Sequence, residues 1–181
     1  MEILIKKKEI DQIITSNPEK YILNKINEIF KEKPKKLSKI KQVITRTSGV
    51  YLIYRGKKKI KNIVYIGETD DLYRRIIGDL SRGKLRYNHT FLGKVARDLG
   101  YKNYLISSHN KTRKVQISKN EVLKIEKRIK GEIGRHYLFA YIGTKDKELA
   151  FLIEGILIRH FVKNFPGQLW NKPKKYQKIS V

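Results

Sequence analysis

Two short runs of β-branched and aromatic residues, joined by a basic link, constrain the fold of this chain most strongly. The runs are GVYLIY at 49–54 and NIVYIG at 62–67, and the link is RGKKKIK at 55–61. Such runs around a polar link are typical of an antiparallel hairpin. If the pairing is centred on Lys58, Tyr51 lies directly opposite Tyr65, and directly opposed residues share a face. The pattern therefore predicts a hairpin with two tyrosines on one face.

Helical patterns precede and follow this hairpin. Asn17-Pro18 is typical of a helix start, and apolar residues then recur at helical spacing up to Pro34. A second short helix is expected between 35 and 46. Beyond the hairpin we expect helices over about 72–80, from His89 to Gly100, from the capping box at Ser118, and over about 145–163, with strands at 104–108 and 136–143.

These elements predict an α/β (α+β) fold, with a small central sheet of mostly antiparallel or mixed strands flanked by helices. Residues 1–46 are expected to form an N-terminal helical appendage, 47–172 the main domain, and 173–181 a basic tail. Residues 103–135 are expected to be an insertion before the third strand. The length of 181 residues suits this organisation, because it suffices for one domain with a real core.

Charge indicates the partner. The chain has 42 Lys and Arg against 17 Asp and Glu, a formal charge of +25 that is spread along its length. A folded surface with this excess favours a polyanion, whose counterions are released on binding. We expect nucleic acid rather than a membrane, because no stretch pairs a basic face with an exposed Trp, Phe or Leu face. The residues predicted to contact it are Lys57, Lys58, Lys59, Arg74, Lys111, Arg113 and Lys114; the alternative is an ordinary solvated lysine surface.

Some classes are excluded at this stage. With no cysteine, the chain has no disulfide framework, no thiolate zinc site and no Cys nucleophile. Its first residues lack the apolar stretch of a signal peptide, and no run approaches the length of a membrane span. We therefore expect a soluble cytoplasmic protein.

One carboxylate stands out. Glu154 lies within AFLIEGILI, where burial of an uncompensated charge would be costly, so it needs a cation, a proton or a route to solvent. A single carboxylate with waters and phosphate oxygens is a normal Mg²⁺ site. Arg75 has the geometry to fork onto a phosphate and stabilise the charge that develops during cleavage. Tyr51 and Tyr65 supply hydroxyls, but a free phenol has a pKa near ~10, so general-base work would need a nearby cation to lower it.

These residues together resemble the GIY-YIG nuclease family. The first motif is Gly49-Val50-Tyr51, and the second, Tyr65-Ile66-Gly67, continues through Arg75 in a pattern similar to Y-I-G-x-T-x-x-L-x-x-R. The segment from Glu154 to Arg159 is similar to the family's E-x-x-L-I-K/R helix, and Asn171 occupies the place of its last Asn. The resemblance covers about residues 47–172, with the motifs in the right order.

The resemblance implies a metal-dependent endonuclease that hydrolyses double-stranded DNA by in-line attack of water. Tyr51 would be the general base or position the water, and Tyr65 would orient the water or the phosphate. Arg75 would stabilise the transition state, Glu154 would bind a single Mg²⁺ or Mn²⁺, and Asn171 would secure the site by hydrogen bonds. A site-specific restriction-type enzyme is the favoured subtype; homing, phage and repair nucleases remain open, as does an inactive nucleic-acid-binding protein on the same scaffold. A homodimer on DNA is also predicted.

The chain departs from the family pattern, and each site residue has a structural alternative. The tyrosines are fourteen residues apart, a wide spacing for the family. Asp79 stands where many members have His or Tyr, so His89 is the available substitute, although it also suits a loop or a helix start. The tyrosines could simply pack across strands, Arg75 could pair with Asp79 at i,i+4, and Glu154 could pair with a Lys. The second YIG, at Tyr141, lacks the downstream Arg and is interpreted as the third core strand.

Overall fold

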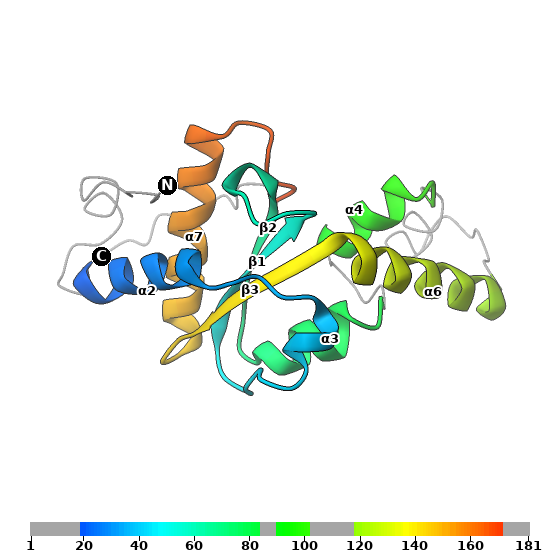
Figure 1. The fold of residues 1–181 in the computed structure, drawn as a ribbon, viewed down its shortest axis with the longest axis horizontal. Helices are drawn as coiled ribbons and strands as arrows, with labels where there is room; N and C mark the ends of the chain where they lie inside the picture. Colours follow the sequence, from blue (N-terminus) through cyan, green and yellow to red (C-terminus); the bar gives the residue numbers. More distant parts are fainter. Residues whose placement is uncertain (1–18, 84–89, 102–117, 172–181) are drawn as a thin grey trace, which may run out of the picture.

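The computed structural model describes residues 19–83, 90–101 and 118–171, which form helices around a three-stranded sheet (Figure 1). The helices are α2 (Glu19–Lys31), α3 (Leu37–Ile40), α4 (Thr90–Asp98), α6 (Lys119–His136) and α7 (Lys147–Asn164), with a 3₁₀ turn η1 (Ile60–Asn62) and a π-helix η2 (Arg74–Leu80). The strands are β1 (Gly49–Arg55), β2 (Ile63–Thr69) and β3 (Tyr137–Gly143). The predicted mixed class with a small antiparallel sheet is confirmed; the strand expected at 104–108 lies outside the described residues.

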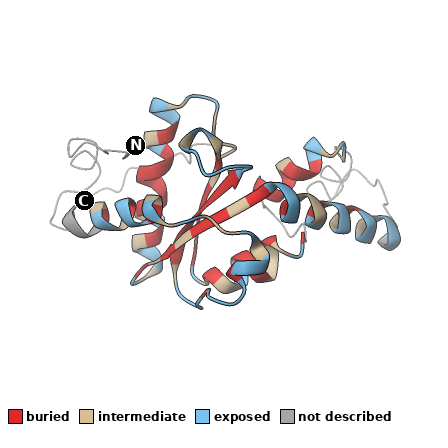
Figure 2. Cartoon of the chain, viewed as in Figure 1, coloured by how far each residue is buried: buried red, intermediate tan, exposed pale blue. Residues whose placement is uncertain are grey.

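The sheet has the order β2-β1-β3, and both pairings are antiparallel. Helices α2 and α7 cover one face, while α3, η2, α4 and α6 pack on the other (Figure 1). Strand β1 is therefore central and covered on both faces, and every residue in it except Arg55 is buried (Figure 2). This position explains why GVYLIY is apolar without alternation, as expected for a strand with no solvent face.

Alternate residues of β1 divide the core into two clusters. Val50, Leu52 and Tyr54 face α2 and α7, and the isoleucines of α2 complete that cluster. Tyr51 and Ile53 face the other way, toward η2, α4 and α6. Residues 19–31, expected within an appendage, thus contribute to the same core as the sheet.

Local signals explain where several helices begin or end. The Ser118 side chain accepts a hydrogen bond from the Glu121 amide at 3.2 Å, so the predicted capping box starts α6. Asp146 accepts from the Leu149 amide at 2.8 Å at the start of α7. Gly100, which follows α4, has a φ of 88° and accommodates the left-handed turn that ends the helix. No helix among the described residues is long and apolar enough to cross a membrane.

The hairpin register differs from the prediction. Tyr51 pairs with Gly67, and Tyr65 pairs with Ile53, so the expected direct opposition of the two tyrosines is wrong. The link is asymmetric, because Ile60–Asn62 form a 3₁₀ turn and the register shifts between Ile53 and Tyr54. The offset is two residues, which preserves the face of a side chain, so the two rings remain diagonal neighbours on one face.

Candidate active site

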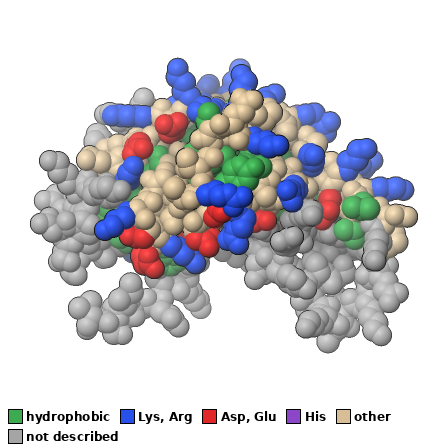
Figure 3. All heavy atoms as spheres, turned by 90° about the horizontal axis from the view of Figure 1, so that it is seen from below, with side chains coloured by type: hydrophobic (Ala, Val, Ile, Leu, Met, Phe, Trp, Pro, Cys, Tyr) green, Lys and Arg blue, Asp and Glu red, His purple; other side chains and the backbone are tan. Residues whose placement is uncertain are grey.

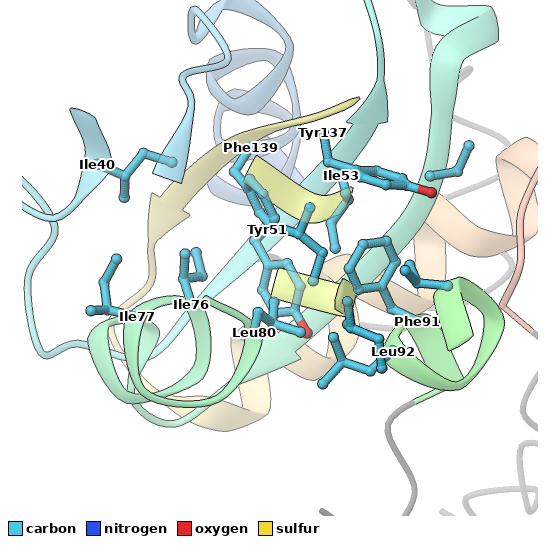
Figure 4. Close-up of a cluster of buried hydrophobic side chains, with 14 of the residues drawn as sticks. Ile40, Tyr51, Ile53, Ile76, Ile77, Leu80, Phe91, Leu92, Tyr137 and Phe139 are labelled. Carbon is cyan, nitrogen blue, oxygen red and sulfur yellow. The ribbon is translucent and has the colours of Figure 1, made fainter. Parts of the chain in front are cut away.

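Tyr51 and Tyr65 form the centre of the site. Their rings stack with centroids 6.2 Å apart, and both rings belong to the cluster between the sheet, η2 and α4. Tyr51 is 3% exposed and lies among buried side chains that include Ile76 and Leu80 of η2 (Figure 4). Phe91 of α4 packs against the Tyr65 ring at 5.8 Å. The two hydroxyls are therefore held in fixed positions by packing on several elements.

Gly67 creates the space for the Tyr51 ring. It lies directly opposite Tyr51 across the hairpin, and a Cβ atom at this position would be 2.4 Å from both Cζ and the hydroxyl of Tyr51. Any other residue at 67 would displace the ring. The glycine of the Tyr-Ile-Gly motif therefore lets Tyr51 lie across strand β2.

Burial and nearby charges set the protonation of both phenols. Burial raises the pKa of Tyr51 well above its ordinary value of 10.0, and the charge of Tyr65 raises it further. Burial also raises the pKa of Tyr65 to about 12, while a hydrogen bond with Tyr51 acts in the opposite direction. The Arg75 guanidinium lowers both pKa values, but burial dominates. Both phenols therefore remain protonated at neutral pH, which suits positioning a water or a phosphate better than removing a proton.

Arg75 lies in the π-helix η2, which follows β2 along the chain. Its charge acts on both tyrosines, and its Nη1 atom is 3.9 Å from the Asp79 carboxylate. The i,i+4 pair expected as an alternative is thus present, and it coexists with the effect of the Arg75 charge on the two tyrosines. Short π-helical segments are rare and occur frequently at functional sites.

Two carboxylates act on the same pair of phenols. Glu154 is 3% exposed on α7, the helix that packs against β1 and β2, and its charge raises the pKa of both tyrosines. Glu68 of β2 has the same effect on both. Sequence reasoning missed Glu68, because a single polar residue near a strand end looks like an ordinary solvent-facing position; its place next to Gly67 in the second motif was the available signal.

Asn171 joins the C-terminal segment to the edge of β2. Its side-chain oxygen accepts from the Ile66 amide at 2.9 Å, and its Nδ2 donates to the Ile66 carbonyl at 2.7 Å. The Trp170 amide donates to the Val64 carbonyl at 2.8 Å, and the indole ring stacks on Phe91. The segment therefore lies along the edge of β2 and holds the backbone on either side of Tyr65. Trp170 anchors the segment to the core.

The remaining predicted residues lie elsewhere or outside the described part. Lys57, Lys58 and Lys59 are exposed in the hairpin link, where Lys58 donates to the Lys31 carbonyl at 3.4 Å, at the end of α2. Arg74 is exposed and pairs with Asp70 at 2.7 Å. His89, Lys111, Arg113 and Lys114 lie outside the described residues.

Glu154 and Glu68 are the candidate ligands for a metal ion. No three His, Cys, Asp or Glu side chains within residues 19–83, 90–101 and 118–171 form a group able to hold a metal ion. A buried carboxylate with a second one nearby nevertheless fits Mg²⁺, because this ion prefers oxygen ligands and keeps several waters. Comparison with family models, with curated proteins and with solved structures found no match to this chain.

Because tyrosine side chains are buried, we also expect the protein to lose stability at alkaline pH. Burial raises the pKa of Tyr54 to about 12, so the folded state holds this proton more tightly than the unfolded chain, whose pKa is near 10.0. The resulting stability is complete below pH ~10 and falls by about 1.4 kcal/mol per pH unit as the pH rises toward ~12. We expect Tyr54→Phe to move the midpoint of alkaline unfolding, followed by circular dichroism, to higher pH. An unchanged midpoint would contradict this expectation.

Proposed function

We propose that this protein is a metal-dependent endonuclease of the GIY-YIG type, which hydrolyses phosphodiester bonds in double-stranded DNA. The observation that supports it is spatial. Tyr51, Tyr65 and Arg75 come from the hairpin and the following helix, and Glu154 comes from a helix far downstream, yet their charges and rings act on one another. Asn171 secures the strand that carries Tyr65. The cross-strand packing alternative explains the stacked tyrosines but gives no reason for a cation and a buried carboxylate beside them.

Each residue of the candidate site has its own role in the proposed reaction. The two protonated phenols would donate hydrogen bonds that orient the attacking water and the scissile phosphate. Arg75 would stabilise the negative charge that grows on the phosphate oxygens. Asn171 would keep the β2 backbone fixed so that Tyr65 holds its position.

Glu154 would hold the Mg²⁺ or Mn²⁺ ion, and Glu68 is a second carboxylate whose charge acts on both tyrosines. The ion supplies Lewis-acid stabilisation of phosphate charge and activation of water.

Cleavage of supercoiled plasmid tests the proposal. The wild-type chain is expected to nick plasmid in Mg²⁺ and not in chelator, and Tyr65→Phe is expected to reduce the rate about a hundredfold, because one positioned donor is removed. Tyr141→Phe is the matched control, because Tyr141 is a half-buried tyrosine on β3 and lies outside the proposed machinery. A contaminating nuclease would be insensitive to both substitutions.

The outcomes separate the open alternatives. Retained binding of duplex DNA with no nicking in any divalent metal would refute the enzyme and leave an inactive binding protein. Discrete fragments from a long linear duplex would favour a site-specific restriction-type enzyme over a non-specific nuclease. Sedimentation with and without a cleaved duplex tests the homodimer expected from one active site per chain.

A further inference from the structure

Helix α6 exposes a face that contains no acidic residue. Its buried side carries Ile125, Ile129 and Ile133, which pack into the core. At about 100° per residue, the residues within roughly 80° of the centre of the opposite side form a separate group. This group, here called the basic face of α6, consists of Asn120, Leu123, Lys124, Lys127, Arg128, Lys130, Gly131, Gly134 and Arg135.

The acidic residues of α6 lie beside this face. Glu121 is in the first turn, where its amide donates to the Ser118 cap. Glu132 is 3.7 Å from His136 on the flank of the helix. The five basic side chains of the face are all exposed, and they extend over about 17 Å of helix. The result is a positive stripe rather than the mixture of charges typical of a solvated helix surface.

Two glycines of this face pack against no other element in the described part of the chain. Among residues 19–83, 90–101 and 118–171, a Cβ atom at Gly134 would meet nothing within 4 Å, and one at Gly131 would meet only Arg135 Nη2 at 3.8 Å. Glycine is an unfavourable residue inside a helix, so neither position is explained by the fold.

The basic face is tied to the elements that carry the candidate site. Arg128 Nη1 donates to the Tyr101 hydroxyl at 2.9 Å, which joins α6 to the end of α4. Phe91 of α4 packs against Tyr65, and α6 leads directly into β3. Lys and Arg side chains line the end of the molecule formed by α4 and α6 (Figure 3).

We propose that the basic face of α6 docks on the phosphate backbone of double-stranded DNA, outside the site of cleavage. The choice of duplex DNA as the polyanion rests on the proposed function. The surface itself is complementary in charge to a duplex, because a duplex carries one negative charge per ~1.7 Å of axis and a 17 Å stripe matches about ten of them. The glycines allow the sugar-phosphate backbone to lie close to the helix.

Binding of a fluorescent duplex to the full chain in chelator, measured by anisotropy, tests the charge. Lys124→Gln/Lys127→Gln/Arg135→Gln is expected to raise Kd about tenfold or more near ~0.1 M salt, and to reduce the salt slope by about 2 to 3. The matched control is Lys33→Gln/Lys36→Gln/Lys39→Gln, which removes the same charge from exposed positions outside α6 and should change Kd less than about twofold. No change in the first variant, or an equal change in both, would overturn the proposal.

Gly134→Gln tests the close approach separately. This substitution should raise Tm by about 2 °C, because glycine is removed from a helix, and yet weaken duplex binding severalfold. A variant that is more stable and binds DNA normally would overturn the docking geometry. Binding of anionic vesicles instead of duplex through the same lysines would overturn the choice of partner.

Because these measurements require no cleavage, the two proposals fail separately. A chain that binds duplex through α6 but never cleaves it would refute the endonuclease and leave the docking face. A chain that cleaves plasmid while the α6 triple variant binds like wild type would refute only the docking face.

Discussion

Glu154→Gln is expected to reduce plasmid cleavage about a thousandfold while duplex binding in chelator is preserved. The amide keeps the volume of the buried side chain but removes the negative charge that would hold the metal ion. Glu154 is 3% exposed and lies on the helix that packs against β1 and β2, so the amide would occupy the same buried position. The rate of nicking at saturating Mg²⁺, with initial rates compared at equal protein concentration, is the measurement.

Glu148→Gln is the matched control for this substitution. Glu148 lies in the first turn of the same helix, is exposed, and is remote from the tyrosines. It should leave the cleavage rate within about twofold of wild type, as expected for surface substitutions. A second readout separates loss of the metal from general damage: Mg²⁺ should raise Tm of the wild type by ligand linkage and should not raise Tm of Glu154→Gln. Cleavage by Glu154→Gln within tenfold of wild type would refute the assignment.

The sequence was sufficient to predict the helices and strands, but not the register in which β1 and β2 pair. The hairpin and the helices had strong periodicity and clear caps, such as Ser118, and the structure places them where expected. The pairing of Tyr51 depended on the conformation of the link, where a 3₁₀ turn takes up residues that a symmetric loop would have shared between the strands. Such asymmetry arises from local hydrogen bonds, including that from Asn62 Nδ2 to the Lys57 carbonyl at 2.9 Å, which composition does not reveal.

The arrangement of the candidate site could also be predicted only in part from the sequence. Spacing alone gives no reason for Glu154 to act on tyrosines about a hundred residues earlier, and only the resemblance suggested it. Burial changes the chemistry expected of Tyr51. To act as a general base, Tyr51 would need a nearby cation that lowers its pKa. The Arg75 charge does lower this pKa, but burial in the central strand raises it by more. Whether a phenol is a base or a donor thus depends on burial, which the tertiary structure determines.

Gly67→Ala is expected to impair both folding and cleavage. The added methyl group would lie 2.4 Å from Cζ and the hydroxyl of Tyr51, so the ring must move in a densely packed cluster. Overpacking of this kind costs about 1–3 kcal/mol of unfolding free energy. A displacement of about 1 Å at a positioning group can lower the rate about a hundredfold, and Tyr51 is such a group in the proposed site. Chemical denaturation and plasmid nicking measure the two effects on the same preparation.

The Tyr51→Ala background distinguishes this contact from a general intolerance of β2 to substitution. Without the ring, the Tyr51 atoms that the alanine methyl group would overlap are gone. Replacement of a strand glycine by alanine is then intrinsically stabilising by about 0.5–1 kcal/mol. The effect of Gly67→Ala on unfolding free energy should therefore change sign between the two backgrounds, which a double-mutant cycle detects as a coupling of at least ~1 kcal/mol. If the alanine is equally destabilising with and without the Tyr51 ring, Gly67 serves the strand itself and not the position of the tyrosine.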